Sequence, residues 1–167
     1  MSFFERAGLM RPLEGGAFAA TNATVTGDVT LGADVGIWFG CVLRGDDAPL
    51  TVGARTNIQD LTMIHADTGV PNVIGAGCTV GHRAILHGAE VGDRCLIGMG
   101  AIIMDGVTIE DEVIIAAGSL VTPGTRCESR ALYVGSPARW ARALTGEEIA
   151  QLAYSAGYYV TVKDRYL

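Results

Sequence analysis

The chain has 167 residues, the size of one ordinary domain, and its net charge of −6 without a Lys/Arg run argues against nucleic-acid binding. Hydrophobic residues make up 49% of it, but the longest apolar stretch, residues 113–121, is about half as long as a membrane-spanning helix, so no membrane segment is predicted. The first six residues carry an acid and no apolar run, so we expect no signal peptide and a cytoplasmic protein.

Residues 1–24 come before any repeat, and we expect them to cap the open end of the repeat region, where strand edges would otherwise be unpaired. From residue 25 to 126 an aliphatic residue recurs with a period of six. A fixed short period of this kind predicts a solenoid. Every one of the sixteen aliphatic slots is Ile, Leu or Val: Val25, Leu31, Ile37, Leu43, Val52, Ile58, Ile64, Ile74, Val80, Leu86, Val91, Ile97, Ile103, Ile109, Ile115 and Val121.

Such hexads resemble those of the hexapeptide-repeat superfamily. The resemblance implies an all-β solenoid, a left-handed parallel β-helix in which each hexad forms one short strand and three hexads complete a triangular coil. Sixteen hexads then make a little over five coils, stacked at roughly 4.8 Å. The β-helix is expected over residues 25–138 of a single domain.

Three hexads break the period, because the slots at 43, 64 and 86 are followed after nine, ten and five residues. These hexads are three apart, so all the irregularity falls at one corner of successive coils. Loops on one side of a solenoid often form its binding face. We therefore predict a functional edge between residues 43 and 91.

The cysteines fit the repeat. Cys41, Cys78 and Cys95 occupy the small position four residues after a slot, and Cys127 falls one hexad after Val121. A free thiol behaves as a small apolar group at such a position. We expect buried, unpaired thiols in a reducing compartment rather than disulfides or a nucleophile.

After the repeats, residues 132–138 read as an extended exit with a Pro turn, which leaves 139–167 as a C-terminal segment. Thr145 and Glu148 have the spacing of a capping box. A helix is therefore predicted to begin after Thr145, to extend to about Tyr159, and to lie along the prism.

The chain contains three histidines. His65 and His87 each follow a slot by one residue in hexads that are three apart, so they share a face on neighbouring coils. His82 follows slot 80 by two residues and belongs to the adjacent face. A cyclic trimer would bring His82 of one chain to His65 and His87 of the next, and three imidazoles with an open fourth position form a catalytic zinc site. The alternative is three ordinary surface histidines.

Other polar residues fall near the histidines by the same counting. Arg44 lies beneath His65, and Asp60 lies beneath His82 with Gln59 beside it. A carboxylate there could fix an imidazole tautomer, and Arg44 could pair with an acid of a neighbouring subunit. Arg44 and Asp60 could instead be stacking or interface groups with no catalytic part.

Together these residues resemble the γ-class carbonic anhydrases. The segments that carry the resemblance are 42–46 (VLRGD), 55–60 (RTNIQD), 64–65 (IH), 80–88 (VGHRAILHG), 96–100 (LIGMG) and 133–137 (YVGSP). It covers nearly the whole chain and is far more specific than hexads alone.

The resemblance implies a homotrimer with a metal ion at each subunit interface, bound by His65 and His87 of one chain and His82 of its neighbour. Zinc is expected, with Fe²⁺ or Co²⁺ as alternatives. Gln59 would orient the metal-bound water or bicarbonate. Arg44 and Asp60 would hold the interface, with Asp46 in the same network.

The implied reaction is the reversible hydration of CO₂, in which zinc lowers the pKa of bound water to about 7 and the resulting hydroxide attacks CO₂. The chain departs from the family pattern in the loop 66–72, which has no glutamate to carry the proton away. Asp47 stands where the family has a second glutamate, and Asp67 has a shorter side chain. Two alternatives therefore remain: a metal-dependent reaction on an acyl thioester, or a metal-braced scaffold without catalysis. A hexapeptide acetyltransferase is less favoured, because its catalytic base is generally a histidine.

Overall fold

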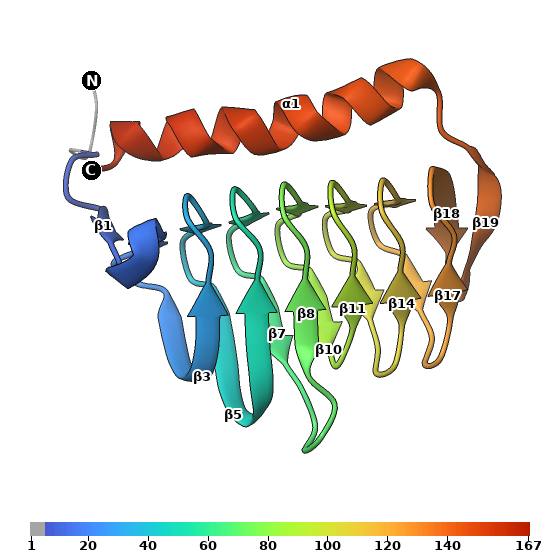
Figure 1. The fold of residues 1–167 in the computed structure, drawn as a ribbon, viewed down its shortest axis with the longest axis horizontal. Helices are drawn as coiled ribbons and strands as arrows, with labels where there is room; N and C mark the ends of the chain where they lie inside the picture. The colour runs from blue at the N-terminus through green and yellow to red at the C-terminus, as the bar shows by residue number, and fades with distance from the viewer. Residues whose placement is uncertain (1–5) are drawn as a thin grey trace.

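The chain forms short strands, with a corner after each hexad, that wind into a parallel β-solenoid of about six turns. One long helix follows the solenoid in the sequence and lies along it (Figure 1). This computed structural model describes residues 6–167, so the first five residues of the expected cap lie outside it. The predicted fold class, a left-handed parallel β-helix of hexapeptide repeats with a C-terminal helix, is confirmed.

The prism has three faces, which we name by what they carry. The helix face contains β2 (Phe18–Ala20), β4 (Gly36–Ile37), β6 (Asn57–Ile58), β9 (Thr79–Val80), β12 (Leu96–Ile97), β15 (Ile114–Ile115) and β18 (Ala131–Gly135). The histidine face contains β7 (Met63–His65), β10 (Ile85–His87), β13 (Ile102–Ile103) and β16 (Leu120–Val121). The third face contains β8 (Asn72–Ile74), β11 (Glu90–Val91), β14 (Thr108–Ile109) and β17 (Arg126–Cys127).

Two longer strands, β3 (Thr24–Leu31) and β5 (Val42–Val52), run round the corner between the histidine face and the third face. The first part of β5 pairs with β7 and its last part pairs with β8. The irregular hexads lie at this same corner, as their spacing predicted, and the longest loop, between β7 and β8, projects from the prism there (Figure 1).

The solenoid is longer than the aliphatic slots alone suggest. Ala19 pairs in parallel register with Ile37, and Tyr133 pairs with Ile115, so both residues occupy slots. The sequence count of a little over five coils was too low because neither residue is Ile, Leu or Val. The first rung is thus β2, and it pairs on its other side with the antiparallel β1 (Met10–Pro12), which is followed by a short 3₁₀ helix, η1 (Glu14–Gly16).

The slot residues form one continuous core. From Ile37 to Val121 every slot is at most 3% exposed, whereas Val25 and Leu31 in the first coil are partly buried. The four cysteines are free and buried, as expected. Burial raises the pKa of the Cys41 and Cys127 thiols to about 11. They are therefore protonated packing groups at neutral pH.

Strand β19 (Ala138–Ala143) turns back antiparallel to β18, and α1 (Gly146–Val162) then runs the length of the prism along the helix face, near β6 and β9 (Figure 1). Both halves of the predicted capping box are present, from Glu148 N–H to Thr145 Oγ1 and from Thr145 N–H to the Glu148 carboxylate. The helix ends at Val162, one turn later than predicted, and continues into η2 (Lys163–Arg165).

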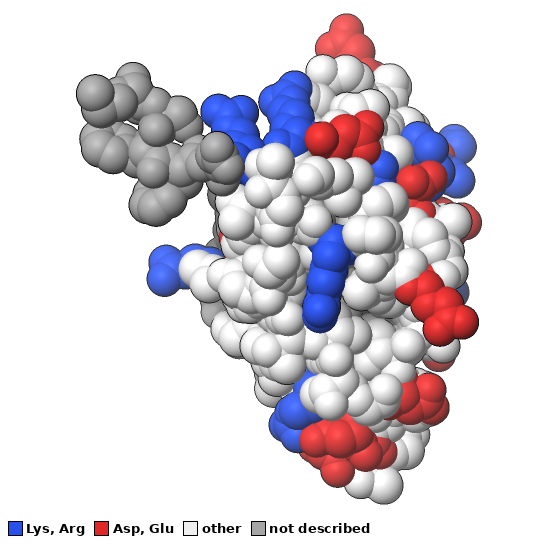
Figure 2. All heavy atoms as spheres, turned by 90° about the vertical axis from the view of Figure 1, so that its left-hand side faces the viewer, with Lys and Arg blue, Asp and Glu red and all other residues white. Residues whose placement is uncertain are grey.

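The C-terminus returns to the N-terminal end of the prism, where the Met10 N–H of β1 donates to Tyr166 O. Seen from this end, the surface is mostly uncharged, with a basic side chain across its middle and acidic side chains mainly along the right-hand edge and at the bottom (Figure 2). Within residues 6–167, no helix is long and apolar enough to cross a membrane.

Candidate metal centre

Two imidazoles meet at the edge of the histidine face. His65 ends β7 and His87 ends β10, and the two residues are direct partners in the parallel register of these strands. The Nδ1 atom of His65 lies 3.3 Å from the Nε2 atom of His87. The predicted pairing of these two residues on neighbouring coils is confirmed.

In each ring, the outer nitrogen, which is the one that points away from the other histidine, lies next to an acidic side chain. Asp105 Oδ1 lies 2.7 Å from Nδ1 of His87. Nε2 of His65 lies 3.2 Å from an oxygen of Asp46 and 3.1 Å from one of Asp47. Carboxylates accept and do not donate when ionised, so each imidazole places its proton on the outer nitrogen.

The two inner nitrogens are then both lone-pair acceptors that face each other, an arrangement that suits a cation. Two nitrogens that bind one zinc ion tetrahedrally at about 2.0–2.1 Å lie roughly 3.3–3.4 Å apart. The observed 3.3 Å between His65 and His87 fits this spacing. Carboxylates on the far nitrogens also match the usual surroundings of metal-binding histidines.

His82 lies at the opposite edge of the histidine face, in the turn that precedes β10. Its Nδ1 atom is 2.8 Å from Asp60 Oδ2, which confirms the predicted proximity of these two residues. The His82 side chain is 40% exposed. Among residues 6–167, the side-chain groups that could hold a metal within one chain include His65 or His87 but not His82. A single chain therefore brings together two of the three predicted ligands.

Gln59 and Asp60 are held by neighbours on the helix face. Gln59 is buried, and its Nε2 donates to Asn57 Oδ1 at 3.1 Å. Asp60 Oδ1 accepts the N–H of Phe39 at 3.3 Å while its other oxygen faces His82. Gln59 and His82 line one cavity of about 300 Å³. Gln59 therefore opens onto the same space as the third histidine.

Arg44 pairs within its own chain. Its Nη1 donates to Asp46, and Asp47 lies 3.9 Å away. Loss of some surrounding water raises the pKa of Asp46, but the hydrogen bond from Arg44, a backbone hydrogen bond and the nearby charges of Arg44 and His65 together keep that pKa below its ordinary value. Asp46 thus connects Arg44 to His65. The predicted contact of Arg44 with a neighbouring subunit stays a prediction.

Two residues of this region, Asp105 and Asn72, were not predicted from the sequence. Asp105 faces Gly88, one position beyond His87, and the same register counting that placed the histidines could have found it. Asn72 closes the loop after His65: it is 1% exposed, donates to His65 O at 2.5 Å and accepts the Ala89 N–H at 3.0 Å. No spacing in the sequence signals Asn72, because the loop that it closes has no repeat.

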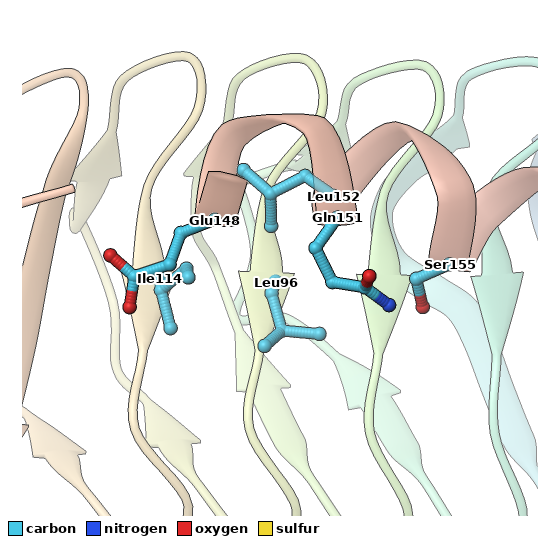
Figure 3. A pocket seen from close by; sticks show the side chains of 6 residues that line it. All are labelled: Leu96, Ile114, Glu148, Gln151, Leu152 and Ser155. Carbon is cyan, nitrogen blue, oxygen red and sulfur yellow. The ribbon is translucent and has the colours of Figure 1, made fainter. Parts of the chain in front are cut away.

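A groove runs between α1 and the helix face. One part is a cavity of about 240 Å³ in which Leu96 and Ile114 form the floor and helix side chains such as Leu152 and Ser155 point towards it (Figure 3). Its lining shares Leu96, Ile114 and Ser155 with the cavity that contains Gln59 and His82. The groove is therefore continuous with the His82 side of the candidate centre.

The fold is that of a hexapeptide-repeat β-helix, and a sequence profile described as bacterial transferase hexapeptide (six repeats) matches residues 88–123. The chain is 51% identical to Protein YrdA of Escherichia coli, covering 87% of this chain and 83% of that protein. It is 46% identical to a carbonic anhydrase of Geobacillus kaustophilus, covering 86% and 79%. The chain belongs to the γ-class carbonic anhydrase-like family.

Other relatives are longer. The chain is 43% identical to gamma carbonic anhydrase 2, mitochondrial, of Arabidopsis thaliana, but spans only 54% of that protein's length. Among solved structures, a hexapeptide transferase family protein from Anaplasma phagocytophilum superposes with a TM-score of 0.81 at 39% identity, covering 89% of this chain and 92% of that one. A putative acetyltransferase from Bacillus cereus gives 0.82 at 38% identity, covering 89% of each chain.

Proposed function

We propose that this protein is a metal-dependent carbonic anhydrase that hydrates CO₂ reversibly at the interfaces of a homotrimer. The observation that carries the proposal is the pair of imidazole nitrogens 3.3 Å apart, each backed by a carboxylate on its far side. Zinc is the proposed metal, with Fe²⁺ or Co²⁺ as alternatives. Family membership supports the same chemistry.

The position of His82, away from the other two histidines of its own chain, is the reason why we propose a trimer. It precedes β10 and His87 ends it, so the two lie at opposite edges of one face. If the prisms pack face to face around a threefold axis, the His82 edge of one chain meets the His65–His87 edge of the next. Between these edges runs an outward ladder of apolar side chains in register, which packing would bury: Met63, Ile85, Ile102 and Leu120.

Zinc bound by three imidazoles would supply a water with a pKa near 7. The side chains around the metal would position the reactants and the ligands. Gln59 orients the reacting water or bicarbonate by hydrogen bonding, and Asp60 holds His82 through a 2.8 Å contact with Nδ1. Asp47 and Asp67, both exposed, are the carboxylates we assign to proton release. Because both are short, we expect turnover to depend on the buffer concentration.

The test is stopped-flow CO₂ hydration by protein of known metal content, compared with His82→Ala. We expect turnover proportional to bound zinc and lost in the variant. Full zinc occupancy without turnover, even in concentrated buffer that can carry the proton, would exclude the hydratase. The scaffold would then be favoured if zinc removal dissociates the trimer.

A second candidate, a metal-dependent reaction on an acyl thioester, is favoured by the groove beside α1. The groove has an apolar floor at Leu96 and Ile114 and reaches Gln59 and His82, so an extended acyl chain fits it. The discriminating measurement is hydrolysis of acyl thioesters of increasing chain length. Gln151→Trp, at a residue that lines the part of the groove beside α1 but not the cavity with Gln59 and His82, should abolish that activity and spare CO₂ hydration.

A further inference from the structure

We infer that Asp105 is a positioning residue of the metal centre, which fixes His87 with its Nε2 lone pair turned towards His65. The inference rests on the proposed metal site and adds a residue to it. Asp105 belongs to the next coil, in the turn that follows β13. Its Oδ1 atom lies 2.7 Å from His87 Nδ1, the shortest of the carboxylate–imidazole contacts among the described residues.

Register places Asp105 next to Gly88 rather than next to His87. Leu86 pairs with Ile103, so two positions further along, Asp105 stands opposite Gly88. The carboxylate must therefore lean back over Gly88 to reach the imidazole of the preceding residue. This contact is possible only if the space above Gly88 is empty.

Gly88 provides that space. A Cβ atom added there would lie 2.6 Å from Asp105 Oδ1 and 2.8 Å from Val70 Cγ1. The φ angle of Gly88 is +60°, which glycine adopts at little cost. The Gly106 N–H donates to Gly88 O at 2.7 Å, so the turn that carries Asp105 is fastened to the turn that follows His87. The absence of a side chain at Gly88 therefore leaves the space that the Asp105 carboxylate fills beside His87.

The function of this contact follows from imidazole chemistry. A neutral imidazole carries one proton, and an acceptor at Nδ1 places that proton there and leaves Nε2 as a lone pair. Nε2 of His87 is the atom that faces His65 Nδ1. Without Asp105, the ring could rotate or carry its proton on Nε2, where it would block the ligand position.

The same neighbourhood supplies a matched control. Asp67 is the other carboxylate near His87 and Asp105, with ligand atoms of the three residues all within 4.8 Å of one another. Within residues 6–167 it makes no salt bridge to His87, in contrast to Asp105. Asp67→Asn therefore removes the same charge from the same place and leaves the positioning contact in place.

The experiment measures zinc affinity by competition with a chromophoric chelator on the full-length protein, for wild type, Asp105→Asn, Asp67→Asn and His87→Ala. We expect Asp105→Asn to weaken zinc binding about 10–100-fold, Asp67→Asn to change it far less, and His87→Ala to abolish it. Unchanged affinity in Asp105→Asn, or equal losses in the two Asp variants, would overturn the inference. If His87→Ala binds zinc normally, the proposed metal site itself fails.

A second readout does not depend on metal. Imidazole ¹⁵N spectra of the metal-free protein should show His87 protonated on Nδ1 in the wild type and in Asp67→Asn. In Asp105→Asn the Nε2-protonated form should appear. An unchanged tautomer in Asp105→Asn would show that another group orients the ring.

Discussion

The Nδ1 atom of His65 and the Nε2 atom of His87 lie 3.3 Å apart on neighbouring coils of one face. Strand register alone brings the two residues together, but side-chain contacts decide which nitrogens face each other. Those contacts come from Asp46 and Asp47 on one side and Asp105 on the other. The two histidines and the carboxylates that orient them thus come from four successive coils.

Sharing of the site between subunits can be tested with mixed trimers. Neither His82→Ala chains nor chains with both His65→Ala and His87→Ala should bind zinc or hydrate CO₂ alone. When the two are refolded together, each mixed cyclic trimer contains one interface with all three histidines. Partial recovery of zinc binding is therefore expected, measured by metal analysis of the purified mixture. Zinc binding by His82→Ala alone would place the site within one chain.

Trimer formation should depend on the apolar ladder of the histidine face. Ile102 is 38% exposed in the single chain and stands in register between Ile85 and Leu120. Ile102→Glu would bury a charge at the interface, so we expect dissociation to monomers in sedimentation velocity. Val134→Glu is the control, because Val134 is 45% exposed but lies away from this face. Trimers with Ile102→Glu would mean that another face associates.

Coil stacking requires glycine at Gly53. A Cβ atom there would lie 2.6 Å from Ala76 N and from Gly75 C, both in the backbone of the next coil. Gly53→Ala should therefore lower the free energy of unfolding by about 1–3 kcal/mol. Gly146→Ala, with open space around it, should stay within about 0.5 kcal/mol of wild type. Guanidinium unfolding followed by circular dichroism measures both, and equal midpoints would contradict the packing argument.

The start of α1 should be sensitive to acid. The bidentate hydrogen bond from Arg142, with the capping contact of Thr145, lowers the pKa of Glu148 from 4.5 to about 2. A carboxyl whose pKa is depressed by folding stabilises the fold above its unfolded pKa, and this contribution is lost as the pH falls through the folded pKa. Glu148→Gln should therefore be less stable than wild type at pH 7, and the difference should shrink between pH 4.5 and about 2.

The control for this effect is Glu147→Gln, which removes a charge from the same helical turn without the Arg142 contact. Thermal unfolding of the three proteins across this pH range gives the comparison. A difference between Glu148→Gln and wild type that does not change with pH would assign the effect to side-chain shape rather than to ionisation.

The sequence by itself determined the solenoid, the irregular corner, the capping box at Thr145 and the pairing of His65 with His87. Each is a matter of counting, because a period of six fixes which residues stack and a local motif fixes where a helix begins. Counting failed where residue type departed from the pattern, so the rungs at Ala19 and Tyr133 were not recognised.

Only the tertiary structure decided how side chains lean between coils. Asp105 reaches His87 over Gly88, Arg44 turns to Asp46 of its own chain, and Asn72 fastens a loop that has no repeat. The groove beside α1 also depends on where the helix docks. These features depend on rotamers and on distances across coils, and a one-dimensional period carries no information about either.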